Sequence, residues 1–421
     1  MLIEFQVANF GSFKDPISLN MQSSREQRFR DRVPRFERTY RMSVNPIAAI
    51  YGANASGKSN LLEALRMLRS MVLGTRSVDR QRDYVFMLDP DMRNEPTLFK
   101  LVFTVNDTMH SYFLAIRNGQ VIEEYLSTLT ATQENIVFDR EEGQIKFGSP
   151  WESDPLINEL ATTVQKDKTL AGRLADVLKG NERYSELLCI YNFLKKIIHI
   201  TPRQEKMLIP EFYRDFELDA ALSALDTGVT HLDFTTIKEG QWPFNREEIS
   251  EHLPDELSAE SGVSVLQIKD GKLYRISRDK EDNTTLSHIR FCHQGRHGSK
   301  YLLDWRQESQ GTRKILALLP WMWFAANMSD LPILLVDELD HSLHTQLTKA
   351  LIEGYLSSCD HTTRAQLIFT AHDLLLMDLD YLRRDEIWIT DKNKYGESIL
   401  IGLPEYKGIR SDKNIIKSYL Q

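Results

Sequence analysis

Residues 46–65 read PIAAIYGANASGKSNLLEAL and contain the strongest motif of the chain. The apolar run from Ile47 to Tyr51 follows a proline and is typical of a buried parallel strand. The turn Gly52–Ser59 matches the pattern G-x-x-x-x-G-K-[ST], and the apolar residues that follow it recur at helical spacing. A strand, a glycine-rich turn and a helix in this order predict a phosphate-binding loop.

The residue types in this turn suit the phosphates of a nucleotide. Gly52 and Gly57 let backbone N–H groups approach phosphate oxygens at a helix N-terminus. Lys58 would reach the β- and γ-phosphates, and the Ser59 hydroxyl would ligate Mg²⁺. We expect ATP and Mg²⁺ as ligands of the following set: Gly52, Ala53, Asn54, Ala55, Ser56, Gly57, Lys58, Ser59 and Asn60.

Two later strands carry residues that complement this loop. The stretch ILLVDE places Asp337 and Glu338 at the end of an apolar strand, where Asp337 would hold Mg²⁺ and Glu338 would orient or deprotonate the attacking water. In LIFTAHD, His372 ends the next strand and would contact the γ-phosphate. The sequence therefore predicts Glu338, His372 and Lys58 as catalytic residues, and Ser59 and Asp337 as metal ligands.

A polar turn before a further helix raises a separate question. ESQGT places Ser309, Gln310, Gly311 and Thr312 ahead of the apolar run ILALLPWMWFAAN, so these donors lie at a helix N-terminus. One P-loop already surrounds its nucleotide on one side. A second cluster of donors is best explained if it serves the nucleotide of another subunit.

Composition and charge narrow the class of protein. The chain has 421 residues, 42% hydrophobic and 27% charged, with a net charge of −8, which argues against whole-protein attraction to nucleic acid. The arginine-rich loop from Arg25 to Arg41 leaves local contact with DNA or RNA open. We find no signal peptide and no bilayer-length apolar run, so we expect a cytoplasmic protein with no membrane contact.

Alternating strands and helices predict an α/β fold. We expect a mixed, mainly parallel sheet core, an antiparallel β subdomain and an inserted, mainly helical module. The expected blocks are 1–150 for an N-terminal ATPase lobe, 151–290 for a helical partner-binding arm, and 291–421 for a C-terminal ATPase lobe.

The motifs GANASGKS, ESQGT, LLVDELD and TAH, in this order, resemble the ATP-binding cassette (ABC) ATPases. The opening LIEFQVANFGSF and the long separation of P-loop and signature are similar to the soluble heads of the SMC and RecF type. VDELDHSLH and AQLIFTAHDLLLMDLDYLRRDEIWITDK look more specifically like the RloA/AbiL-type ATPases of bacterial antiphage loci, relatives of PtuA and AriA.

The resemblance implies roles for individual residues. Gly52–Ser59 would be Walker A, Ser309–Thr312 a signature acting in trans, and Asp337 and Glu338 the Walker B pair. Asp340 would cross the interface as the D-loop residue, and His372 would be the switch histidine. The Q-loop glutamine stays open between Gln81 and Gln133.

The resemblance also implies a function. We expect an ATPase that forms a head-to-head dimer, or a higher even oligomer, around two ATP molecules. It would gate an effector protein encoded nearby, a toxin, nuclease or sensor, in antiviral defence. Two alternatives are a RecF-like ATP-dependent DNA-binding protein in repair, and a low-turnover ATP-bound scaffold that sequesters an effector.

Overall fold

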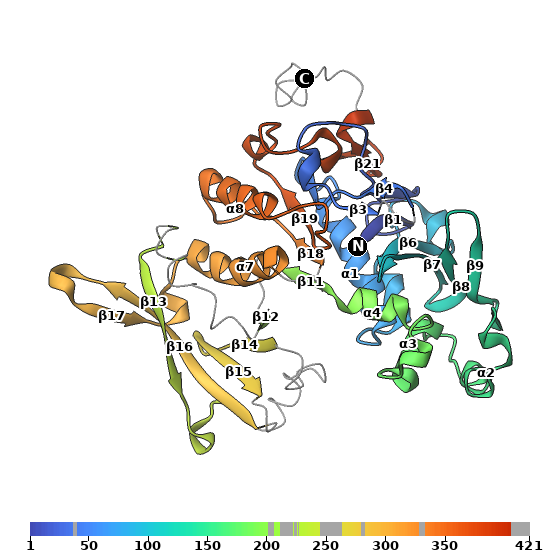
Figure 1. The fold of residues 1–421 in the computed structure, drawn as a ribbon, viewed down its shortest axis with the longest axis horizontal. Helices are drawn as coiled ribbons and strands as arrows, with labels where there is room; N and C mark the ends of the chain where they lie inside the picture. Colours follow the sequence, from blue (N-terminus) through green and yellow to red (C-terminus); the bar gives the residue numbers. More distant parts are fainter. Residues whose placement is uncertain are drawn as a thin grey trace. The chain divides into compact units, whose positions relative to one another are not determined.

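The computed structural model describes residues 1–36, 40–200, 206–210, 222, 225, 227–244, 263–278, 283–327 and 333–405 (Figure 1). The chain divides into two compact units. The first comprises residues 1–199, 329–339 and 356–421, and the second comprises residues 200–328 and 340–355. Each unit has its own β-sheet structure and its own hydrophobic core.

A six-stranded, largely parallel sheet carries the motifs of the first unit. Its strand order is β11-β18-β19-β5-β20-β21, and β18, β19, β5 and β20 pair in parallel, while β21 pairs antiparallel with β20. The residues of β5, β18 and β19 are all buried, as expected of strands covered on both faces. The bounds are β5 Ile47–Gly52, β11 Ile197–Ile200, β18 Ile333–Val336, β19 Gln366–Ala371, β20 Ile387–Lys392 and β21 Ser398–Gly402.

An antiparallel sheet of seven strands forms the other layer of the first unit, in the order β10-β9-β8-β7-β6-β1-β2. The expected antiparallel β subdomain is present, and strands β6 to β10 form a meander in it. The bounds are β1 Leu2–Ala8, β2 Ile17–Asn20, β6 Thr97–Val105, β7 Thr108–Arg117, β8 Gln120–Leu129, β9 Glu134–Glu141 and β10 Gln144–Phe147; a separate pair consists of β3 Arg35–Phe36 and β4 Met42–Ser43.

Helix α1, Lys58–Val72, lies in the core that the two sheets of this unit share. Leu65 of α1 belongs to one buried cluster with Ile50 and Ile368 of the parallel sheet and with Phe5 and Phe99 of the antiparallel sheet. Burial of an apolar side chain of this size stabilises a fold by about 2 kcal/mol. The helix that follows the P-loop is therefore anchored on both sides.

Part of the segment 151–290, expected as a helical arm, lies outside the described residues, and its described part contains both helices and strands. Its helices are α2 Pro155–Thr162, α3 Leu170–Leu178 and α4 Cys189–Lys195, and they pack into the core of the first unit. From Ile197 to residue 290, the described residues include strands β11 to β16, one short 3-10 turn at Glu239–Gln241 and a helical residue, Leu222. The run after α4, Ile197–Ile200, is short and rich in β-branched isoleucine. It forms the edge strand β11 and does not continue the helix.

The second unit is built on an antiparallel sheet of order β12-β14-β15-β16-β13, with β17 paired to β16. The helix α7, Gln310–Asn327, packs on it through Ile315 and Leu316, which cluster with Leu273, Ile289 and Phe291. The remaining bounds are β12 Lys206–Pro210, β13 Val229–Thr236, β14 Val263–Lys269, β15 Lys272–Arg278, β16 Thr284–Gln294, β17 Lys300–Leu303 and α8 Thr345–Ser357.

The expected α/β fold class is confirmed, with a parallel core sheet and an antiparallel subdomain. Contacts divide the chain into two units, where the sequence suggested three consecutive blocks. The difference arises because α2–α4 join the core of the first unit and the strands after them form the second. Among the described helices, none has the length and apolar character needed to cross a bilayer.

Candidate functional site

The P-loop follows β5 and leads directly into α1. Its backbone is left-handed at Ala55, with φ of 62°, and at Gly57, with φ of 113°. A Cβ at Gly52 would lie only 2.3 Å from Thr390 Oγ1, so the loop is pressed against β20 at a distance that only glycine permits. Lys58 is buried, and its Nζ donates to the carbonyls of Gly52 at 2.7 Å and Ala53 at 2.9 Å.

Two of the residues assigned to nucleotide binding fix the loop to its surroundings. Ser56 is buried, and its Oγ lies 2.5 Å from Thr390 Oγ1. Asn60 donates from Nδ2 to Ser12 Oγ at 2.8 Å. Ala53, Asn54, Ala55 and Ser59 are exposed, which leaves the outer rim of the loop accessible to a ligand.

The acidic pair lies at the same sheet edge because β18 and β19 are parallel neighbours of β5. Asp337 Oδ1 accepts hydrogen bonds from Ser59 Oγ at 3.1 Å and from Thr370 Oγ1 at 2.6 Å. The structure thus brings together the two residues that the sequence assigned to a metal ion. Their hydroxyl and carboxylate oxygens are the hard donors that Mg²⁺ prefers.

Glu338 has a left-handed backbone with φ of 50°, an uncommon conformation for a non-glycine residue. Its N–H donates to Thr370 Oγ1 at 2.7 Å, so one hydroxyl contacts both members of the acidic pair. His372 Nε2 lies 3.5 Å from Glu338 Oε1, and both side chains are about one third exposed, at 38% and 35%. The carboxylate and the histidine assigned to catalysis therefore face each other at an accessible edge.

These residues fit a magnesium nucleotide. The loop holds a buried lysine and a glycine that no larger residue can replace, and a serine hydroxyl lies within hydrogen-bond distance of an aspartate. A P-loop uses these parts to hold phosphates and Mg²⁺.

The signature residues belong to the second unit, at the start of α7. Ser309 Oγ accepts from Thr312 N at 3.0 Å and lies 2.8 Å from Thr312 Oγ1, so Ser309 caps the helix. Ser309 and Gln310 are exposed, whereas Thr312 is buried. The exposed part of the expected donor cluster is therefore its first half.

The turn that contains Asp340 contacts this helix start within the second unit. Ser342 Oγ donates to Gln310 Oε1 at 3.0 Å, and a Cβ at Gly311 would lie 2.9 Å from Ser342 O. Asp340 is half-buried, and its carbonyl accepts from Leu343 N at 3.2 Å. The signature and the expected D-loop residue are thus connected by direct contacts between their turns.

Each candidate for the Q-loop glutamine makes a local hydrogen bond. Gln81 is buried and donates from Nε2 to Thr97 Oγ1 at 2.7 Å, which ties a 3-10 turn to β6. Gln133 lies in the exposed turn between β8 and β9, where its carbonyl accepts from Thr130 N. Both glutamines have local structural roles.

Sequence reasoning missed Thr370 and Thr390. Both are fully buried hydroxyls near the ends of strands, one against the acidic pair and the other against Ser56. The signal was available in part, because Thr370 stands two residues before His372 in LIFTAH. Its contact with Asp337 depends on the order of strands in the sheet, which local patterns do not give.

The fold and the site define a P-loop ATPase of the AAA class. The family described as "AAA domain, putative AbiEii toxin, Type IV TA system" matches residues 47–171 and 236–378, and the chain belongs to this family. No curated protein matches the chain. Of 82 solved chains that match it, one is described as "SMC head domain from Thermotoga maritima", with 12% identity and a TM-score of 0.37; the alignment covers 95% of this chain and 98% of that chain.

Proposed function

We propose that the protein hydrolyses ATP as an ABC-type head of the SMC and RecF branch and gates a partner effector in antiphage defence. The observation that carries the proposal is the continuous set of contacts from Ser59 through Asp337 and Thr370 to Glu338 and His372. A P-loop hydroxyl, an acidic pair and a histidine from three neighbouring parallel strands meet at one sheet edge.

Each side chain has a task in this mechanism. Backbone N–H groups of the loop and Lys58 bind the phosphates of ATP. Mg²⁺, when bound, supplies positive charge at the phosphate oxygens, and Ser59 and Asp337 would hold it. Glu338 orients the attacking water and accepts its proton, and His372 contacts the γ-phosphate.

Two heads are needed in this proposal because the signature donors serve another subunit. Ser309 and Gln310 are exposed at the start of α7, where the helix dipole favours an anion. The dimer, or a higher even oligomer, would close around two ATP molecules and reopen after hydrolysis.

The effector and the pathway are supported by motif likeness and by the family description. That description names an AbiEii toxin and a type IV toxin-antitoxin system. Together with the sequence likeness to RloA/AbiL-type ATPases, it favours a toxin, nuclease or sensor encoded nearby, in the cytoplasm.

A size measurement with ATP and Mg²⁺ tests the proposal. Glu338→Gln should accumulate a closed dimer, whereas Lys58→Ala should lose nucleotide binding; both are read by chromatography with light scattering. Identical profiles for the wild type and Glu338→Gln with ATP would contradict closure on ATP.

The signature requires its own variant. Ser309→Arg should bind ATP as an isolated subunit but neither close nor hydrolyse, whereas Ser299→Arg, at an exposed position of the same unit, should behave as wild type. If Ser309→Arg hydrolyses ATP at the normal rate, the signature does not act in trans.

The RecF-like alternative has weaker support. Arg32 donates to Tyr381 O at 2.7 Å and pairs with Glu386 at 2.6 Å, and Arg28 donates to Leu379 O, so two arginines of the loop contact the protein itself. Charge reversal at the exposed Arg25 and Arg41 should abolish DNA binding if this alternative holds. A steady-state ATPase assay distinguishes the effector-gating ATPase and the RecF-like protein, which both hydrolyse ATP, from a scaffold that binds ATP and hardly hydrolyses it.

A further inference from the structure

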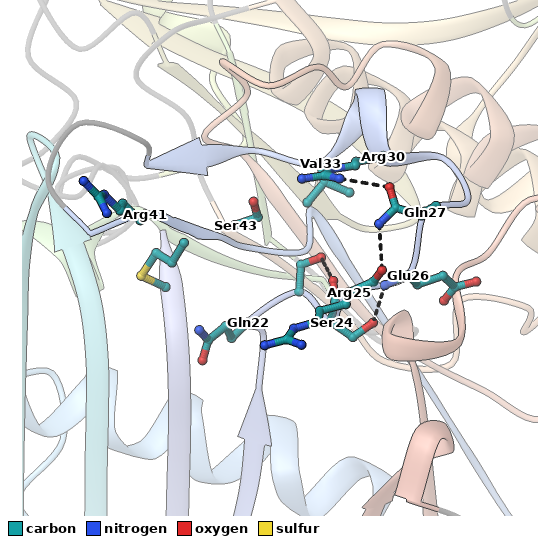
Figure 2. Close-up of a pocket in the computed structure, with 11 residues that line it drawn as sticks. Gln22, Ser24, Arg25, Glu26, Gln27, Arg30, Val33, Arg41 and Ser43 are labelled. Carbon is teal, nitrogen blue, oxygen red and sulfur yellow. Dashed lines mark hydrogen bonds between the residues drawn. The ribbon is translucent and has the colours of Figure 1, made fainter.

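The arginine-rich loop encloses a cavity of about 380 Å³ in the first unit. Figure 2 shows Gln22, Ser24 and Arg25 on one side of it, Arg30 with Gln27 on another, and Arg41 at a third. The volume lies near the lower end of the range for small-molecule sites. The cavity is lined by residues 22–27, 30, 33 and 41–43, which the proposed ATPase mechanism does not use.

Hydrogen-bond donors and positive charge dominate its lining. Arg25, Arg30 and Arg41 are exposed, and serine and glutamine side chains add further polar groups. Among the described residues of the lining, the one carboxylate is that of Glu26, whose Oε2 accepts from Arg384 N at 3.0 Å. Three guanidinium groups against one carboxylate favour an anion with several oxygens, such as a phosphate.

One arginine is held in position before any ligand binds. Arg30 Nη1 donates to Gln27 Oε1 at 2.9 Å, and Gln27 Nε2 in turn donates to Arg25 O at 2.9 Å. Gln27 therefore connects two arginines of the lining. A donor that is already oriented loses less conformational freedom when an anion binds.

A buried arginine, Arg383, holds residues of the cavity lining in place through hydrogen bonds. Arg383 is fully buried and donates to both carboxylate oxygens of Asp385, at 3.0 and 2.9 Å. It also donates to Glu26 O at 3.0 Å and to Ser23 Oγ at 3.1 Å, both of them in residues of the lining. This arginine fixes the loop to the segment that leads into β20.

Asp385 completes the support because it accepts from Ser24 N at 2.6 Å. Burial by itself would raise the pKa of Asp385, but the hydrogen bonds and charge of Arg383, together with Ser24, hold this pKa below its usual value. The carboxylate therefore stays ionised at neutral pH and keeps Arg383 in place.

The shape and lining favour a small ligand over a nucleic-acid strand. In the part of the lining that the structure describes, Val33 and Met42 are the apolar residues, and there is no aromatic ring on which a base could stack. The arginines surround a cavity of limited volume, whereas a strand is bound along an extended basic groove. The recognised group is therefore the phosphate itself.

We propose that this cavity binds a small phosphate-bearing compound, at a site separate from the P-loop. Arg25, Arg30 and Arg41 bind the phosphoryl oxygens, and Ser24 and Gln22 complete the polar lining. The proposal does not depend on ATP hydrolysis.

The test uses inorganic pyrophosphate as the probe and isothermal titration calorimetry as the measurement. The titrations are made on full-length Lys58→Ala, in which the P-loop no longer competes for the probe. Adding Arg25→Ala and Arg41→Ala should weaken pyrophosphate binding at least tenfold, because both substitutions remove charge-assisted hydrogen bonds to the phosphoryl oxygens. Adding Arg117→Ala, an exposed arginine at the end of β7, should leave the affinity unchanged.

Thermal melting of each variant checks that the chain is folded. The proposal is overturned if Lys58→Ala does not bind pyrophosphate, or if the Arg25 and Arg41 substitutions leave its affinity unchanged. A single-stranded oligonucleotide forms the second arm. If it binds in an Arg25- and Arg41-dependent way while pyrophosphate does not, the occupant is nucleic acid and the small-ligand proposal is wrong.

Discussion

Replacing Thr370 with valine should separate the two acidic residues from the strand that positions them. The Thr370 hydroxyl donates to Asp337 Oδ1 at 2.6 Å and accepts from Glu338 N at 2.7 Å, and the residue is fully buried. One of these bonds is charge-assisted, worth about 1.5–3 kcal/mol, and the other is neutral, worth about 0.5–1.5 kcal/mol. Their sum predicts a loss of about 2–4.5 kcal/mol in the free energy of unfolding.

Two measurements test Thr370→Val. Urea denaturation gives its stability, and steady-state ATPase rates over a range of Mg²⁺ concentrations give its kcat and its Mg²⁺ dependence. A displaced Glu338 should lower kcat by roughly tenfold to a hundredfold, and a displaced Asp337 should raise the Mg²⁺ concentration needed for half-maximal rate. Thr370→Ser keeps the hydroxyl and should restore both values. If Thr370→Val matches the wild type in stability and in Mg²⁺ dependence, the hydroxyl does not position the acidic pair.

Two further predictions address the P-loop and the antiparallel sheet. Gly52→Ala puts a Cβ 2.3 Å from Thr390 Oγ1, so ATP affinity should fall at least tenfold by calorimetry, while Gly240→Ala, where a Cβ meets nothing within 4 Å, should not change it. Burial lowers the pKa of His110 from 6.5 to about 4, so the unfolded chain binds a proton that the folded chain excludes. Stability should therefore fall by up to about 3 kcal/mol as the pH drops from 6.5 to 4. Urea titrations should show this loss in wild type and in the exposed control His361→Gln but not in His110→Gln; equal loss in all three would refute it.

The P-loop and the strand and helix beside it could be predicted because the sequence patterns that specify them are local. The buried run before Gly52, the glycine turn and the helical spacing after Lys58 are contiguous in sequence, and they appear as β5, the loop and α1. Asp337 and His372 were predictable for a related reason. Each follows an apolar strand, and the carboxyl ends of parallel strands meet at one edge of a sheet.

The remaining features depend on contacts between distant segments. Thr390 meets Ser56, which lies 334 residues away, only because β20 pairs with β5. The apolar run Ile197–Ile200 is short enough to be either the end of a helix or a short strand. It forms a strand because it pairs with β18. Gln81 resembles a candidate ligand in sequence, but its amide is used in a bond to Thr97.

The boundary between the two units follows the acidic pair directly in the chain. The first unit ends at Leu339 and the second resumes at Asp340, so the boundary comes one residue after Glu338. Before the boundary, Leu339 N donates a hydrogen bond to Thr370 O at 2.9 Å. After it, Ser342 Oγ donates a hydrogen bond to Gln310 Oε1 at 3.0 Å. A few covalently linked residues therefore join Glu338 to the turn that contacts the signature helix. In the proposed mechanism, where the signature serves a neighbouring subunit, these residues are the place to test for coupling between the acidic pair and the subunit contact, by double-mutant cycles of Glu338 and Ser342 substitutions.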